Sequence, residues 1–205
     1  MGLWAKHVVP GLIDQAGRSP AVRGERQRWV PRAHGHVLEL GVGSGLNLAF
    51  YDPARVARVT GIDPSAPLLA RAASRVARAA VPVELIEGSA ERLPFDPGSF
   101  DSALVTYSLC SIDEPVRALT EVRRVLRPGG QLVFVEHGLA PDAGTRWLQR
   151  RLTPIWRRFT GGCRLDRDLP AVLRDAGFAV DDLTTGYNGV VRWLSYTYEG
   201  TARPV

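Results

Sequence analysis

From residue 36 to about residue 191, short apolar runs alternate with longer segments in which apolar residues recur at helical spacing. Five apolar runs predict buried strands, at His36–Leu40, Arg58–Asp63, Val83–Ile86, Ser102–Thr106 and Gln131–Glu136. The connections between them are long enough to return the chain, so we expect parallel strands. This alternation is typical of an α/β domain.

Two of the connections carry an apolar stripe at helical spacing. The first follows Ser65, a good N-cap residue, and consists of Leu68, Leu69, Ala72 and Val76. The second consists of Val116, Leu119, Val122 and Leu126. The sequence Pro128-Gly-Gly130 is expected to stop this second helix.

Further elements are predicted on both sides of these strands. The segment before His36 is expected to be a helical lead-in, with Trp29 and Val30 as its apolar contacts. After Gly138 the pattern predicts a helical region, a helix near Asp168–Ala176, and two last strands near Val180 and Arg192. No linker interrupts the chain, so we expect a single domain.

Composition adds few constraints. The 205 residues are 45% hydrophobic and 23% charged, as in a globular protein, and no apolar run has the roughly 18 residues of a membrane span. Met1–Lys6 lacks the pattern of a secretory signal, and two cysteines make neither a disulfide framework nor a four-ligand zinc site. We therefore expect a cytoplasmic protein without a metal. The net charge of +5 comes from scattered arginines, so no nucleic-acid partner is expected.

Glycines cluster directly after the first predicted strand, at Gly41, Gly43 and Gly45. They allow the backbone to turn sharply and to approach a ligand closely. A short helix is predicted over Leu46–Phe50, whose first N–H groups would face an anionic group of that ligand. Asp63 ends the second strand, where a carboxylate can accept hydrogen bonds from both hydroxyls of a ribose. Together these features favour a nucleotide-type ligand over a tight turn without one.

The spacing G-x-G-x-G after an acid differs from the G-x-G-x-x-G of dinucleotide sites, and the chain has no room for the second domain of a dehydrogenase. Five segments resemble the successive motifs of class I S-adenosylmethionine (SAM)-dependent methyltransferases: Glu39–Gly45, Gly61–Ser65, Gly88–Phe95, Ser99–Asp101 and Arg124–Gly130. The resemblance implies a single-domain Rossmann-like α/β fold, a seven-stranded, mostly parallel sheet of order 3-2-1-4-5-7-6, and helices on both faces. It divides the domain 1–205 into a helical lead-in or lid (1–35), a SAM-binding core (36–137) and substrate-side helices and last strands (138–205).

The resemblance also implies which residues bind SAM. The glycines would pack on the methionine part, Asp63 would hold the ribose, and Pro64 and Ser65 would flank the adenine. Ser89 departs from the family pattern, because many members carry Asp there. The full expected set is Glu39, Gly41, Gly43, Gly45, Asn47, Asp63, Pro64, Ser65, Ser89, Ala90, Thr106 and Tyr107.

The methyl acceptor is expected to be a small molecule. The tetrapeptide Asn/Asp-Pro-Pro-Tyr of adenine and glutamine N-methyltransferases is absent after the fourth strand. Segments at Leu109–Ser111, Glu136–Gly138 and Gly161–Arg167 resemble a narrower branch, the alkyl-thiol S-methyltransferases associated with the endoplasmic reticulum and their small bacterial relatives. That likeness implies a thiol or sulfide as acceptor. The alternatives are phosphatidylethanolamine, a small phenol or quinone, and a SAM-binding protein without catalysis.

Three residues are candidates for the chemistry: His137, Tyr107 and Cys110. His137 would act as a general base or is a structural histidine, and Cys110 would face the acceptor or is a small buried hydrophobe. If His137 assists deprotonation of a thiol, its replacement by Ala should cost about 10²-fold near neutral pH and much less at high pH. Glu136 would orient His137 or cap a turn.

One basic segment carries aromatic residues. Seven arginines lie between Arg146 and Arg167, interleaved with Trp147, Trp156 and other apolar residues. Such a segment can contact an anionic membrane, here through 146–158, or it is a solvated lid helix. The two tryptophans would wall an apolar pocket or pack as in an ordinary outer helix.

Overall fold

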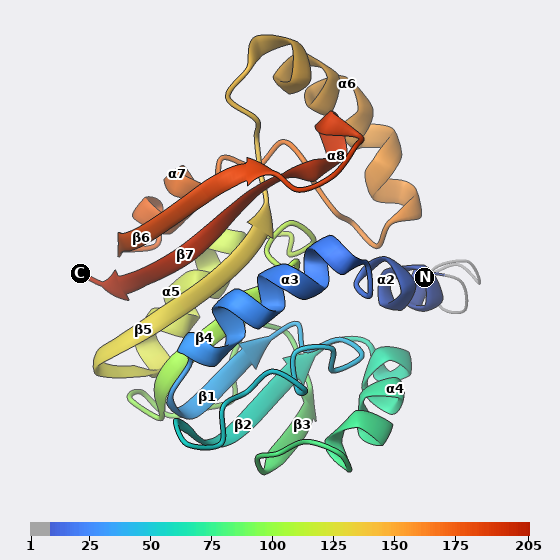
Figure 1. The fold of residues 1–205 in the computed structure, drawn as a ribbon. Coiled ribbons are helices and arrows are strands. Elements are labelled where there is room, and N and C mark those ends of the chain that lie inside the picture. The colour runs from blue at the N-terminus through green and yellow to red at the C-terminus, as the bar shows by residue number, and fades with distance from the viewer. Residues whose placement is uncertain (1–8) are drawn as a thin grey trace.

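The computed structural model describes residues 9–205 and builds them around one sheet of seven strands in the order β3-β2-β1-β4-β5-β7-β6 (Figure 1). The strands are β1 (Gly35–Leu40), β2 (Val56–Asp63), β3 (Val83–Glu87), β4 (Phe100–Thr106), β5 (Leu126–His137), β6 (Phe178–Tyr187) and β7 (Tyr196–Pro204). The first five are mutually parallel, and β7 runs antiparallel to both of its neighbours. The predicted fold class and strand order are confirmed.

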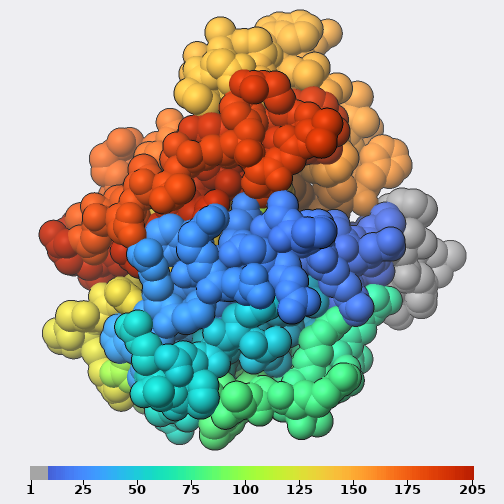
Figure 2. All heavy atoms as spheres, in the orientation of Figure 1, coloured from blue at the N-terminus to red at the C-terminus, as the bar shows by residue number. Residues whose placement is uncertain are grey.

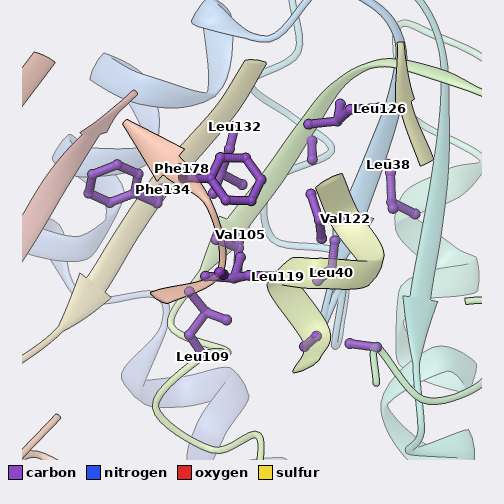
Figure 3. Packing of buried hydrophobic residues seen from close by; sticks show 14 of the residues in the cluster. Leu38, Leu40, Val105, Leu109, Leu119, Val122, Leu126, Leu132, Phe134 and Phe178 are labelled. Atoms are coloured by element: carbon purple, nitrogen blue, oxygen red, sulfur yellow. The ribbon is translucent and has the colours of Figure 1, made fainter. Parts of the chain in front are cut away.

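Helices cover both faces of the sheet. On one face, α5 (Pro115–Val125) and α7 (Leu169–Asp175) pack against strand residues in an apolar cluster that Figure 3 shows at close range. There Leu119 and Val122 of α5 lie against Leu38 and Val105 of the sheet. This packing holds β1 and β4 side by side, and both strands end at the same edge.

The opposite face is covered by α3 (Pro20–Trp29), which crosses in front of the sheet in Figure 1. Trp29 is 1% exposed and lies in a second apolar cluster with Val37 and Leu104, and Val30 is fully buried there. The lead-in is therefore helical, with the two apolar contacts that the sequence predicts. The turn η1 (Val30–Arg32) joins it to β1.

Residues 9–205 also form the helices α2 (Val9–Ala16), α4 (Ala66–Val76), α6 (Ala143–Phe159) and α8 (Arg192–Ser195). The prediction for Met1–Lys6 falls outside the described residues. Ser65 precedes α4 as predicted, but its side chain makes no capping hydrogen bond. Asp168 caps α7 by accepting from Ala171 N at 3.1 Å.

Three predicted elements are wrong in detail. Residues 46–50 form turns instead of a helix, because the N–H groups of Leu48 and Phe50 bond only three residues back. Leu126 begins β5 instead of ending α5, since it pairs with Phe100 and precedes the extended segment that leads into Pro128. Arg192 belongs to α8, and the last strand starts four residues later, at Tyr196.

Candidate active site

The glycine-rich loop follows β1 at the carboxyl edge of the sheet. Gly41, Gly43 and Gly45 have φ values of 62°, 54° and 78°, a region that residues with a Cβ rarely adopt. A Cβ on Gly41 would collide with Ser108 Oγ, and a Cβ on Gly45 would lie 3.2 Å from Ala72 Cβ. The loop therefore needs glycine for its conformation, and at two positions also for close packing.

Asp63 ends β2 beside this loop and is 6% exposed. Its Oδ2 accepts from Gly43 N at 3.0 Å and its Oδ1 accepts from Ser65 N at 2.8 Å. Burial raises the pKa of the carboxyl group, although both hydrogen bonds favour the charged form. Because a carboxylate oxygen can accept two hydrogen bonds, each oxygen keeps capacity for a ligand hydroxyl.

A buried polar network lies beneath the loop. Asn47 Nδ2 donates to Glu39 Oε1 at 2.8 Å and to Thr106 Oγ1 at 2.9 Å, and Tyr51 Oη donates to Glu39 Oε2 at 2.7 Å. Burial raises the pKa of Glu39 to about 7. Arg26 of α3 completes the network by donating from Nε to Asn47 Oδ1 at 2.9 Å. Three of the expected cofactor residues, Glu39, Asn47 and Thr106, are thus brought together and support the loop from below.

Helices α2 and α3 form hydrogen bonds with residues of the candidate site. Asp14 of α2 accepts from Ser44 Oγ of the glycine loop at 2.5 Å and from Arg75 Nη2 of α4 at 2.9 Å. Glu25 of α3 accepts hydrogen bonds from Tyr107 Oη and from Asn188 Nδ2. The sequence analysis assigned no role to Asp14, Glu25 or Asn188, because no local motif marks them. Only the tertiary fold brings them to the carboxyl edge of the sheet.

The loop after β4 is held by Glu136, which is completely buried at the end of β5. Its Oε1 accepts from Ser108 N at 2.6 Å and from Leu109 N at 2.8 Å, and its Oε2 accepts from Cys110 N at 3.3 Å. Burial raises the pKa of Glu136 to about 7. Glu136 was expected either to orient His137 or to cap a turn, and its three hydrogen bonds to backbone N–H groups show that it caps a turn.

Tyr107 and His137 face each other at this edge. Their ring centroids are 4.6 Å apart and their planes are inclined by 59°. Tyr107 has a φ of 53°, and within residues 9–205 no other residue except glycine has a positive φ. Such strained backbone is often found at functional sites. The Nδ1 of His137 is buried and has no hydrogen-bond partner among the described residues, and burial lowers the pKa of the ring to about 4.

Cys110 lies further along the same loop and is 3% exposed. The N–H of Arg164 donates to Cys110 O at 2.8 Å, which places the 162–164 segment against this loop. The pKa of Cys110 is raised well above its usual range, mainly by a hydrogen bond with the Cys163 thiol and in second place by burial of the Cys110 side chain. Both cysteines are free, and their thiols lie close to each other.

The remaining expected residues line the edge beside Asp63. Pro64 and Ser65 continue directly from it, and Gly88 N donates to Asp63 O at 3.2 Å, so the loop after β3 is adjacent. In that loop Ser89 is exposed and accepts from Glu91 N at 3.2 Å, whereas Ala90 is buried. The side chain of Ser89 offers a neutral hydroxyl to a ligand where many family members offer a carboxylate.

These residues fit SAM. The glycine loop leaves its backbone free of Cβ atoms, Asp63 retains acceptor capacity for two ribose hydroxyls, and the unpartnered His137 Nδ1 lies at the same edge. In the part of the chain from residue 9 onward, no group of three or more His, Cys, Asp or Glu residues is arranged to hold a metal ion.

Comparisons with known proteins agree with this geometry. Residues 38–134 match the family described as Methyltransferase domain. The chain is 34% identical over 147 residues to human Thiol S-methyltransferase TMT1B, covering 70% of this chain and 59% of that protein. It is 44% identical over 112 residues to Phosphatidylethanolamine N-methyltransferase of Cereibacter sphaeroides, 54% of each chain. The chain thus spans less than two thirds of the length of either relative.

A solved structure shows the same fold. The 1,6-didemethyltoxoflavin-N1-methyltransferase of Burkholderia thailandensis, with bound S-adenosylhomocysteine, superposes with a TM-score of 0.70 at 20% identity, covering 96% of this chain and 84% of that one. The matched family, the strand order and the glycine loop with its strand-end acid all agree. The chain belongs to the class I SAM-dependent methyltransferases.

Proposed function

We propose that this protein transfers the methyl group of SAM to the sulfur of a small thiol or of hydrogen sulfide. The similarity to Thiol S-methyltransferase TMT1B, which extends over 70% of the chain, supports a thiol acceptor. The observation that carries the proposal is the state of His137, whose ring is uncharged at neutral pH and has a buried Nδ1 without a partner.

The proton chemistry of the site favours a thiol over an amine or a phenol. Amines and phenols lose their protons near pH 10, whereas a thiol with a pKa of about 8.5 is already a few per cent thiolate at neutral pH. His137, with its pKa lowered to about 4, is too weak a base to deprotonate an amine or a phenol. Glu136 and Glu39 are almost completely buried, and their carboxyl groups are held by three backbone N–H groups and by Asn47 and Tyr51 respectively, so neither reaches an acceptor at the edge of the sheet. An acceptor that ionises by itself suits this set of groups.

Each part of the site then has a task. When bound, SAM supplies an electrophilic methyl group on a sulfonium whose departure as a thioether needs no protonation. The glycine loop receives the methionine part and Asp63 the ribose hydroxyls. With its proton on Nδ1, the neutral imidazole of His137 donates a hydrogen bond to the approaching thiolate, whose own proton has gone to solvent, and it adds no positive charge beside the sulfonium. Glu136 keeps the loop that carries Tyr107 and Cys110 in place.

Phospholipid N-methylation is the second candidate, because the identity to the phosphatidylethanolamine enzyme is 44% over 112 residues. An ammonium acceptor would have to lose its proton to another group, and this requirement distinguishes the two candidates chemically. O- or C-methylation of a phenol or quinone places a similar demand on a base.

Production of S-adenosylhomocysteine by the purified protein tests the proposal across sulfide, alkyl thiols, phosphatidylethanolamine vesicles and small phenols. We expect turnover with sulfide or alkyl thiols, and none above background with the other acceptors. Turnover of the amine or of a phenol without turnover of any thiol would contradict the proposal. Asp63→Ala serves as the control with impaired SAM binding, and its activity should fall for every acceptor.

A further inference from the structure

The buried residues of helix α6 are polar, whereas two of its large apolar residues are exposed. Its buried residues are Thr145, Gln149 and Thr153, and Gln149 donates to Gly138 O at 3.1 Å and accepts from Ala140 N at 2.9 Å. Trp147 and Ile155, in contrast, are 64% and 59% exposed. An ordinary outer helix buries its apolar face instead. The outward side of α6 is therefore not explained by packing within this chain.

The same outward side is strongly basic. Helix α6 contains five arginines and no acidic residue: Arg146, Arg150, Arg151, Arg157 and Arg158. Within residues 9–205 none of the five forms an ion pair, and Arg151 instead lies over the Trp147 ring at 5.9 Å. Arginine stems and aromatic rings together form a surface that is apolar close to the helix and cationic at its periphery.

Exposed apolar residues of two neighbouring segments extend this surface. Val190 and Val191, which are 99% and 47% exposed, precede α8. Helix α8 contacts α6 through the rings of Trp156 and Trp193, which meet edge to face with their centroids 5.5 Å apart. Ile13 of α2, which is 42% exposed, lies close to Gly161, just after α6. Figures 1 and 2 show α2, α6 and α8 at the end of the molecule toward which β5 points, where the candidate active site lies.

We propose that this end of the molecule, formed by α2, α6 and α8, docks on the surface of an anionic lipid bilayer. Helix α6 would lie in the interface plane, with Trp147 and Ile155 among the acyl chains and its arginines among the lipid phosphates. A nucleic acid would use the arginines but would leave the exposed Val190, Val191 and Ile155 in water. Docking in this orientation turns the carboxyl edge of the sheet toward the membrane, so an apolar acceptor dissolved in lipid would enter without crossing water. None of the helices within residues 9–205 combines the length and the apolar character that a membrane span requires.

Flotation with vesicles tests the proposal on the full chain. The probes are vesicles of phosphatidylcholine alone and of phosphatidylcholine mixed with phosphatidylglycerol, at salt concentrations of about 0.1 M and about 1 M, where the Debye length is about 10 Å and about 3 Å. We expect binding to the anionic vesicles that weakens strongly at the higher salt. Arg157→Gln/Arg158→Gln should weaken it by at least about tenfold, since each interfacial arginine contributes about fivefold. Trp147→Ser/Ile155→Ser should weaken it similarly.

The matched control is Arg55→Gln/Arg58→Gln, which removes the same charge from two exposed arginines at the start of β2, at the opposite edge of the sheet from Asp63. The control variant should float like the wild type. An equal loss in the control would show that only the net charge matters and would overturn the docking surface. The wild-type protein alone can also refute the docking surface, if it does not float with anionic vesicles at low salt or floats equally with neutral vesicles. These two results do not depend on whether the variants fold. Self-association that Trp147→Ser/Ile155→Ser abolishes would assign the surface to a second copy of the chain instead. Because none of these outcomes requires methyl transfer, they are independent of the proposed acceptor.

Discussion

The protonation state of His137 leads to a specific pH dependence for methyl transfer. With a pKa of about 4, the ring is about 99.9% neutral at pH 7, so its own titration lies well below the working range. A thiol acceptor with a pKa of about 8.5 is about 3% thiolate at pH 7. If the thiolate is the reacting species, kcat/KM should rise about tenfold per pH unit between about pH 6 and pH 8 and level off above about pH 9.

Replacing His137 by Ala should leave the shape of this profile unchanged. The variant loses the hydrogen bond from His137 Nδ1 to the thiolate and the contact with the Tyr107 ring. The lost hydrogen bond is about 1–1.5 kcal/mol, or roughly tenfold in kcat/KM at every pH. The sequence alone suggested a larger loss, concentrated near neutral pH, because it gave no reason for a lowered pKa. Burial is that reason.

The assay is initial-rate formation of S-adenosylhomocysteine from pH 5.5 to 9.5 with one alkyl thiol. His34→Ala, at the opposite end of the sheet before β1, is the matched control and should retain wild-type rates throughout. A loss in His137→Ala that is large near pH 7 and vanishes near pH 9 would refute this reasoning and make His137 a general base. A wild-type rate independent of pH above about pH 5 would refute the thiolate mechanism itself.

Three further predictions concern the cofactor loop and its supports. Asp63→Ala should weaken SAM binding by roughly tenfold to a hundredfold in calorimetry, because it removes a charge-assisted acceptor, and unchanged affinity in the folded variant would remove Asp63 from the site. Because the pKa values of Glu136 and Glu39 are both raised to about 7, wild-type stability should fall as pH rises from 4.5 to about 7, by at most about 3 kcal/mol for each group. Glu136→Gln should reduce this dependence by about half in urea unfolding, and an unchanged slope would contradict the raised pKa of Glu136. Gly41→Ala should lower both stability and SAM affinity, since a Cβ at a φ of 62° meets Ser108 Oγ, and a wild-type unfolding midpoint would speak against that contact.

The strands were well predicted because buried parallel strands are short, continuous apolar runs. His36–Leu40 and Ser102–Thr106 differ from the observed β1 and β4 by one or two residues at one end. The helix expected over Leu46–Phe50 failed for a tertiary reason. In this segment the side chain of Asn47 forms hydrogen bonds with Glu39, Thr106 and Arg26. These contacts hold the segment as successive turns.

The residues expected to bind the cofactor are marked by local sequence motifs, whereas the N-terminal residues that contact the same loops are not. The glycines and Asp63 can be recognised by their spacing along the sequence, because the backbone geometry of the loop and of the strand end fixes that spacing. Asp14 contacts Ser44, and Glu25 contacts Tyr107, only because α2 and α3 pack over the sheet. No sequence pattern predicts these contacts. The outward face of α6 is an intermediate case, since the arginines are visible in the sequence but the burial of Thr145, Gln149 and Thr153 is not.

The central claim, methyl transfer from SAM to a thiol sulfur, is tested most directly by identifying the product. The protein is incubated with SAM carrying a deuterated methyl group and with equal concentrations of an alkyl thiol and phosphatidylethanolamine, and the products are analysed by mass spectrometry. We predict a deuteromethyl thioether of the alkyl thiol, formed together with S-adenosylhomocysteine and strongly reduced in Asp63→Ala. Label found only on the lipid amine, or consumption of SAM without a labelled thioether, would contradict the account.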